Sequence, residues 1–177
     1  MYTSILKMGD KEFKGTLDMY VLKKVQEDLM EMDIRTTIPS IFYNLSKLDM
    51  RYITAFVINS ISRLNEKSAI EFTNAFMSSS DENEQLEKFN SIFTYINNLM
   101  KKCTPSSNDS EKEESIFEDD YLLYEYEDWE LDYMEYIWVS VIGRSDNFWS
   151  VTPKNFFEQI NIHKKFNNIK DEKVEMF

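Results

Sequence analysis

The single cysteine and the single histidine are the residues with the most obvious chemical potential, because a thiol nucleophile needs a neighbouring base to activate it. Cys103 stands at the start of a polar, acidic stretch, and His163 stands in the last expected helix. The sequence contains no feature that would bring these two side chains together. We therefore interpret Cys103 as an incidental thiol and His163 as a surface residue, and we expect that the protein is not an enzyme.

Metal and cofactor motifs give an equally negative result. One cysteine and one histidine cannot supply the clustered ligands of a zinc site, and the 3 glycines leave no room for a glycine-rich phosphate loop. The run Glu118, Asp119 and Asp120 could attract Mg²⁺ or Ca²⁺, but the EF-hand spacing with its central glycine is absent. We expect a solvated acidic run, no metal and no cofactor. An acid–base pair of carboxylates stays open, because carboxylates are many and the sequence does not show which ones meet.

The negative charge is concentrated in one segment. The net charge is −12, and 13 acidic residues but only one basic residue, Lys112, lie between Cys103 and Ile142. The remaining residues balance at 19 acidic and 19 basic. A confined acidic run is typical of a solvated linker or an interaction tail, whereas nucleic-acid binding requires a basic patch, which is not visible. We therefore expect no nucleic acid as a partner.

Aromatic residues alternate with acids just after the most polar part of this segment. Proteins that bind single-stranded nucleic acid combine aromatic side chains with basic grooves, and here the charge has the opposite sign. The aromatic residues therefore form either the core of a small second domain or a protein-binding face, since Trp and Tyr are favoured anchors at interfaces. The residues concerned are Tyr121, Tyr124, Tyr126, Trp129, Tyr133 and Tyr136.

The elements that must position these residues are mainly helices. Glycine and proline number 3 each, and sheet-rich folds need more of both for their turns. Between Tyr2 and Leu17, apolar residues alternate around Gly9-Asp10, which predicts a β-hairpin. Helical periodicity follows, and residues that favour the first positions of a helix mark successive helix starts. These residues are Pro39, Asp49, Asn65 and Asp81.

The fifth expected helix carries the most regular apolar stripe. Its members recur at spacings of 3, 4, 3 and 4 residues, which is typical of a coiled-coil seam or of a helix face turned to its own bundle. The core of the bundle is the favoured interpretation, and a seam would allow partner binding or self-association. The stripe is the first set of candidate partner-binding residues: Leu86, Phe89, Phe93, Ile96 and Met100.

The C-terminal segment predicts a small helical unit of its own. A four-residue repeat predicts one stripe along a helix, Gly143 marks its end, and Thr152-Pro153 marks the start of the last helix. The repeat consists of Trp129, Tyr133, Ile137 and Val141. The second set of candidate partner-binding residues consists of Trp138, Phe148, Trp149 and Phe156.

The predicted fold class is mainly α, in three parts. Residues 1–102 form an N-terminal β-hairpin plus a small helical bundle, residues 103–120 form an acidic flexible linker, and residues 121–177 form a small C-terminal helical domain. The N-terminus lacks the apolar centre of a signal peptide, and no stretch approaches the roughly 18 apolar residues of a membrane span. We expect a cytoplasmic protein with no membrane partner.

Two stretches of the sequence resemble a known family. The first is FKGTLDMYVLKKVQEDLMEMDIRTTIPSIFYNLSKLDMRYITAFVINSISR, and the second, near the other end of the chain, is DYMEYIWVSVIGRSDNFWSVTPKNFFEQINIHKKF. With the acidic joint at 103–120 between them, they are similar to the tail assembly chaperones of long-tailed bacteriophages in their long, two-domain form. The most specific part of the resemblance is the step into the last helix, which matches the family at Gly143, Phe148, Trp149, Thr152 and Pro153.

This resemblance implies a role in virion assembly. The first domain would bind the tape measure protein, a long apolar helical rod. The second would recruit tail tube subunits to it in the host cytoplasm, and the chaperone would be absent from the mature virion. Phe156 and Phe157 stand where the family has small and basic residues, so the partner contacts of the last helix stay open. The alternatives are an acidic phage-encoded inhibitor, a DNA mimic that blocks a host nucleic-acid-binding enzyme, and a helical regulatory binding protein.

Overall fold

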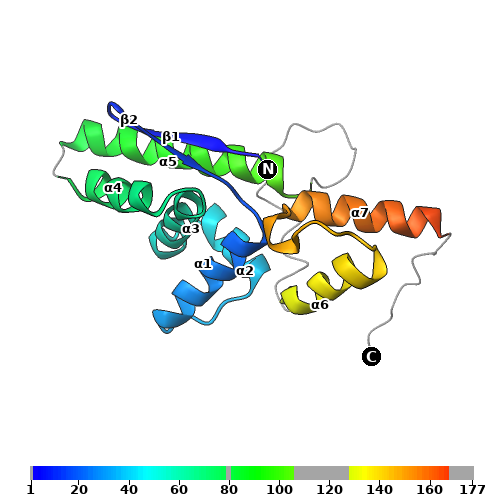
Figure 1. Cartoon of the computed structure of the whole chain (residues 1–177). Coiled ribbons are helices and arrows are strands. Elements are labelled where there is room, and N and C mark those ends of the chain that lie inside the picture. Colours follow the sequence, from blue (N-terminus) through cyan, green and yellow to red (C-terminus); the bar gives the residue numbers. More distant parts are fainter. Residues whose placement is uncertain (1, 79–80, 106–127, 168–177) are drawn as a thin grey trace, which may run out of the picture.

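The computed structural model describes residues 2–78, 81–105 and 128–167. Within these residues the chain is mainly helical and begins with a two-stranded hairpin, which confirms the predicted fold class (Figure 1). Most of the predicted acidic linker, and the predicted fraying from Asn168 onward, lie outside the described residues. The first residues assigned to the linker are described, and they are ordered: Cys103 ends a helix and is buried, and Thr104 is buried after it.

The hairpin consists of strands β1 (Ser4–Met8) and β2 (Lys11–Gly15), which pair antiparallel. Gly9 has a φ of 57°, a conformation that costs glycine little, and it makes the predicted turn between them. Alternate residues of β1 are buried, so the period-two pattern in the sequence corresponds to one face packed on the core.

The helices of the first half begin at capping residues, of which the sequence predicts Asp49, Asn65 and Asp81. In each, a side-chain oxygen of the N-cap residue accepts a hydrogen bond from a backbone N–H in the first turn, which would otherwise lack a partner. The N-cap residues are Asp18, Thr37, Asp49, Asn65 and Asp81. The helices are α1 (Met19–Glu31), α2 (Ile38–Ser46), α3 (Met50–Ser62), α4 (Glu66–Met77) and α5 (Glu82–Cys103).

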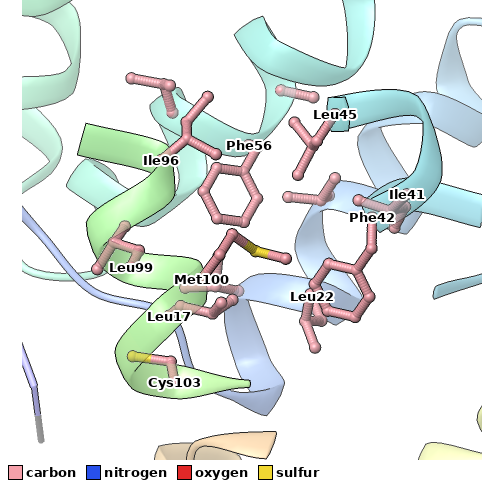
Figure 2. Packing of buried hydrophobic residues seen from close by; sticks show 14 of the residues in the cluster. Leu17, Leu22, Ile41, Phe42, Leu45, Phe56, Ile96, Leu99, Met100 and Cys103 are labelled. Carbon is pink, nitrogen blue, oxygen red and sulfur yellow. The ribbon is translucent and has the colours of Figure 1, made fainter. Parts of the chain in front are cut away.

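The core of this half lies between α5, the hairpin and helices α1 to α3. Figure 2 shows side chains from α1, α2, α3 and α5 meeting around Phe56 and Met100, which are 0% and 1% exposed. The backbone of β2 comes close to α3 and α5 at Gly15, where an added Cβ would stand 1.7 Å from the Tyr95 hydroxyl. That hydroxyl and the Ser60 Oγ are hydrogen-bonded at 2.7 Å, so glycine is required there by close packing.

The C-terminal segment contains α6 (Leu131–Tyr136), the π-helical turn η2 (Ile137–Val141), the 3-10 turn η3 (Phe148–Ser150) and α7 (Pro153–Phe166). Gly143 has the positive φ expected of a residue that ends a helix, at 73°. Thr152 is the N-cap of α7 and accepts a hydrogen bond from the Asn155 N–H, as the Thr-Pro pair predicts.

The face of α6 that packs inward is not the stripe that the sequence predicts. Tyr133 and Val141 belong to the predicted four-residue repeat, yet they are 57% and 46% exposed. The buried residues are instead Leu131, Met134 and Trp138. This short segment offers two apolar stripes, and the one that packs against the rest of the molecule is the one with Leu131, Met134 and Trp138. The i to i+5 bonding of η2 also widens the last turn, so a constant four-residue repeat does not stay on one face.

The described residues on both sides of the predicted linker share one hydrophobic core. The Met19 N–H donates to the Val151 carbonyl at 2.9 Å, which attaches the start of α1 to the turn before α7. A second contact joins the two parts at α2, where the Asp128 carboxylate accepts a hydrogen bond from the Ile38 N–H at 2.8 Å. This N–H lies at the positive N-terminus of the helix. The division into two domains stays a prediction, but the described parts of both are packed together (Figure 1).

Candidate partner-binding surfaces

The predicted stripe of α5 divides into a buried part and an exposed part. Ile96 and Met100 are 3% and 1% exposed and belong to the core, so they present no surface to a partner in this structure. Leu86 and Phe89 are 61% and 43% exposed, although they belong to the same repeat, and Phe93 between the two parts is 41% exposed. The candidate surface on this helix is therefore its N-terminal half.

Phe89 is held from beneath by a row of aromatic rings. Its ring meets that of Phe76 edge to face at a centroid distance of 6.0 Å. Phe76 stacks on Phe72 at 6.0 Å, and Phe72 meets Phe13 of the hairpin at 5.7 Å. Such pairs contribute beyond simple burial, so one side of the Phe89 ring is fixed while the rest faces solvent. We name Phe76, Leu86 and Phe89 the α4–α5 face.

Lys88 connects the two helices of this face, and sequence reasoning missed it. Its side chain is only 8% exposed. The ammonium donates to the Ala75 carbonyl at 3.1 Å and to the Ser78 carbonyl at 3.3 Å, at the C-terminal end of α4. A cation is favoured at this end because the last carbonyls of a helix carry partial negative charge. The helical repeat predicts the position of Lys88 on α5. It does not predict that the ammonium meets the C-terminal end of α4.

Acidic residues surround the exposed half of α5. Four of them lie in its first two turns or at its cap, and all are exposed: Asp81, Glu82, Glu84 and Glu87. Lys88 is the one basic residue of this stretch, and its ammonium is turned toward α4. The α4–α5 face is therefore apolar with a negative border.

Most of the C-terminal candidates are core residues. Trp138, Phe148 and Phe156 are each 0% or 1% exposed, and Phe156 lies 6.1 Å and 5.8 Å from the other two rings. The Trp138 Nε1–H donates to the Asp146 carbonyl at 3.0 Å, which satisfies its buried polar atom. These three candidate side chains therefore expose almost no surface to a partner in this structure. The contact between the Phe148 and Phe156 rings holds η3 against α7.

Trp149 is the C-terminal candidate that reaches the surface, where it is half-buried. The ammonium of Lys23 lies 4.6 Å from the centre of its ring, a cation–π contact between α1 and η3. The Phe148 ring also meets the Trp149 ring edge to face at a centroid distance of 5.1 Å. Trp149 is therefore part of the contact between the two halves of the chain.

A second exposed apolar face lies on α6 and η2, opposite the buried side of these turns. The rings of Tyr133 and Tyr136 stack at 6.3 Å, and both residues are 57% exposed. Val139 continues the face at 53% exposed. Sequence reasoning left the aromatic residues here open between a core and a protein-binding face. Trp129 and Trp138 face inward and these two tyrosines face outward, so the segment contributes to the core and also exposes aromatic surface, while protein binding stays a prediction.

A buried ion pair attaches the C-terminal segment to the N-terminal half. The Arg63 Nε donates to the Asp18 Oδ2 at 2.8 Å, and its Nη2 donates to the Ser150 Oγ at 3.0 Å. The Asp18 side chain is 0% exposed and also caps α1 by accepting from the Val21 N–H. Burial raises the pKa of Asp18 above its ordinary 3.8 and outweighs the opposing hydrogen bond from Arg63.

The two residues first weighed for catalysis differ in their surroundings. Cys103 is buried at the end of α5, and this burial raises the pKa of its thiol to about 11. Such a thiol is a poor nucleophile, because the thiolate is the reactive form. His163 lies in α7 and its ring Nε2 is 3.2 Å from the Asn167 side chain. No hydrogen bond between Cys103 and His163 occurs in the part of the chain that the structure describes.

Further features are limited to the described residues. They contain no group of three or more potential metal ligands. None of the described helices is long and apolar enough to cross a membrane. The predicted acidic run at 118–120 lies outside the described residues.

Comparison with known proteins returns no relative. No protein-family model matches the sequence, no curated protein matches it, and no solved structure matches the fold. The resemblance to tail assembly chaperones therefore stays a prediction that rests on the residues quoted for it.

Proposed function

We propose that this protein is a tail assembly chaperone of a long-tailed bacteriophage, which binds the tape measure protein and recruits tail tube subunits to it. The proposal rests on the sequence resemblance and on one structural observation, the exposed α4–α5 face. Leu86 and Phe89 belong to a stripe whose later members, Ile96 and Met100, are buried in the core. An amphipathic helix of a partner would extend that packing outward.

The negative border of the α4–α5 face favours binding of a different protein over association with a second copy of this chain. Two copies joined through Leu86 and Phe89 would bring two sets of exposed carboxylates together, including Glu82 and Glu87. Like charges close to each other oppose association, and by a larger amount when they are desolvated. A helical rod with apolar and basic side chains meets no such repulsion.

Recruitment of the second partner is assigned to the C-terminal segment. Phe148 and Phe156 are core residues, so the assignment rests on the surface of this segment, with the half-buried Trp149 and the exposed Tyr133 and Tyr136. Tyrosine and tryptophan are favoured anchors at protein interfaces because each offers a large area with few rotatable bonds.

Co-expression with helical fragments of the cognate tape measure protein tests the first role. The full chain should raise the soluble yield of such fragments and co-purify with them. The double variant Leu86→Ser with Phe89→Ser should lose this effect, because it removes the apolar surface while leaving the buried half of α5 intact. The measurement is the soluble fraction of the fragment after lysis, followed by a pull-down.

The matched control is the double variant Ile162→Ser with Phe166→Ser on α7. These residues are also exposed, at 58% and 86%, so the change in surface polarity is of the same kind. We expect this control to protect the fragments as well as the unaltered chain. Equal loss in both variants, or no protection by the unaltered chain, would contradict the assignment.

A further inference from the structure

A hollow of about 530 Å³ lies between α1 and the start of α6. Its walls come from two parts of the chain that are distant in sequence. One part is α1, with Lys23 and Gln26, and the other is the segment 129–133. The hollow adjoins the exposed tyrosines, because Tyr133 both lines it and stacks on Tyr136.

The aromatic wall of the hollow is held rigidly. The Trp129 ring packs against Phe42 at 5.8 Å and against Phe157 at 5.3 Å. The backbone before it is fixed by Asp128, whose carboxylate accepts hydrogen bonds from Ile38 and from Gln26. A wall that is ordered before binding loses little entropy when a ligand arrives.

Some polar groups of the hollow are paired within the protein, and others face solvent. The Gln26 amide donates to the Thr36 carbonyl at 2.9 Å and to Asp128 at 2.6 Å. The Lys23 ammonium lies over the Trp149 ring. The carboxylates of Glu130 and Asp132 line the hollow as well, and neither forms an ion pair or a side-chain hydrogen bond with any described residue.

We propose that this hollow binds an arginine side chain of a protein partner, between Trp129 and Tyr133 and against the carboxylates of Glu130 and Asp132. A guanidinium is planar and weakly hydrated, so it stacks on aromatic rings and at the same time donates to carboxylates. Two carboxylates against one ammonium leave the hollow negative, which favours a cation. The stacked tyrosines beside it supply apolar area for the residues that flank the arginine.

The test uses the full chain and a defined peptide. The peptide carries arginine at every fourth position among alanine and leucine, and its ends are acetylated and amidated. It has about 15 residues, a length at which such helices begin to form. A control peptide has citrulline in place of each arginine, which keeps the shape of the side chain and removes its charge. Binding is followed by the NMR signals of the three indole N–H groups.

We expect the arginine peptide to shift the Trp129 indole signal and to leave that of the buried Trp138 in place. Asp132→Asn and Tyr133→Ala should each weaken binding by about fivefold, the size of one cation–π or charged contact. Both residues are exposed and outside the core, so both variants should fold.

Glu158→Gln is the matched control, since it changes the net charge by the same amount as Asp132→Asn and lies exposed on α7. It should bind the arginine peptide as the unaltered chain does, and the citrulline peptide should bind weakly to every variant. Equal binding of the two peptides would overturn the proposal. So would a loss in Glu158→Gln as large as that in Asp132→Asn, because binding would then follow only the overall negative charge.

Discussion

The two halves of α5 have the same kind of sequence and opposite surroundings. In the C-terminal half, Ile96, Leu99 and Met100 are buried among the hairpin and helices α1 to α3 (Figure 2). In the N-terminal half, Leu86 and Phe89 continue the same repeat and remain exposed. A regular apolar stripe therefore shows which face of a helix is apolar. It does not show how far along the helix the molecule itself covers that face.

The uncovered half carries a charge pattern that the covered half lacks. Its exposed carboxylates begin at Asp81 and end at Glu87, while the last turn of the helix carries Lys101 and Lys102. Acids at the start and bases at the end also suit the helix dipole, which accounts for part of this order. The remaining distinction is the exposed apolar surface at Leu86 and Phe89, which helix stability alone does not require.

The largest expected effect is the contrast between equal truncations in the two halves. Leu99→Ala should lower the free energy of unfolding by about 2–5 kcal/mol, because it leaves a cavity in a fully buried site. Leu86→Ala should change it by less than about 0.5 kcal/mol, because the side chain is exposed. Urea denaturation followed by circular dichroism measures both. Equal losses would show that the N-terminal half is also packed in solution.

A second test concerns the buried junction between the halves of the chain. Arg63→Met should lower the free energy of unfolding by about 3 kcal/mol, because it leaves the Asp18 carboxylate buried without a cation. Adding Asp18→Asn to this variant should restore part of the loss, since asparagine keeps the α1 cap and carries no charge. Denaturation of the single and double variants gives the coupling energy. A double variant that is less stable than Arg63→Met would contradict the proposed cause.

Lys88 allows a finer test at the boundary of the exposed half. Lys88→Met should lower the free energy of unfolding by about 1 kcal/mol, because the α4 carbonyls lose their charged donor while the apolar stem is retained. Lys67→Met, at an exposed position in the first turn of α4, is the control and should have a smaller effect. Comparable losses from both would indicate that charge number, and not the contact with the end of α4, is responsible.

The smallest expected effect is a pH dependence from Asp18. Its pKa is raised in the folded state, so its contribution to stability is present in full below 3.8 and is lost as pH rises through the folded value. The lowered pKa values of Asp49 and Asp146 act in the opposite direction, since hydrogen bonds from Arg51 and Arg144 stabilise their charged forms.

Comparison with Asp18→Asn isolates the first contribution, because Asp49 and Asp146 titrate in both proteins. The stability of the unaltered chain relative to this variant should fall as pH rises above 3.8 and through the raised folded-state pKa of Asp18. Unfolding free energies at a series of pH values give the slope. A relative stability that rises over this range would mean that the ion pair with Arg63 outweighs the burial of Asp18.

The features that the sequence predicts correctly depend on neighbours along the chain. The caps Asp49, Asn65, Asp81 and Thr152 each bond to a backbone N–H two or three residues later. The turn at Gly9 and the helix end at Gly143 need only a positive φ, which glycine supplies. Local rules therefore suffice for the hairpin and for most helix starts.

The features that the sequence predicts incorrectly, or does not predict, depend on residues far apart. The choice between the Tyr133 and Met134 stripes is made by what α6 packs against. The burial of Cys103 follows from the surrounding core, although the next residues along the chain are polar. The contacts of Arg63 with η3 and of Asp128 with α2 join positions 87 and 90 residues apart, which no local pattern records.

Hydrogen–deuterium exchange of the full chain with and without a soluble tape measure fragment tests the binding role of α5 most directly. Protection from exchange should increase in peptides that cover residues 82–93, while those that cover 95–103 are already protected and change little. The Leu86→Ser with Phe89→Ser variant should show no such increase. Unchanged exchange over 82–93 in a complex that demonstrably forms would contradict the assignment of the exposed half of α5 as the binding surface.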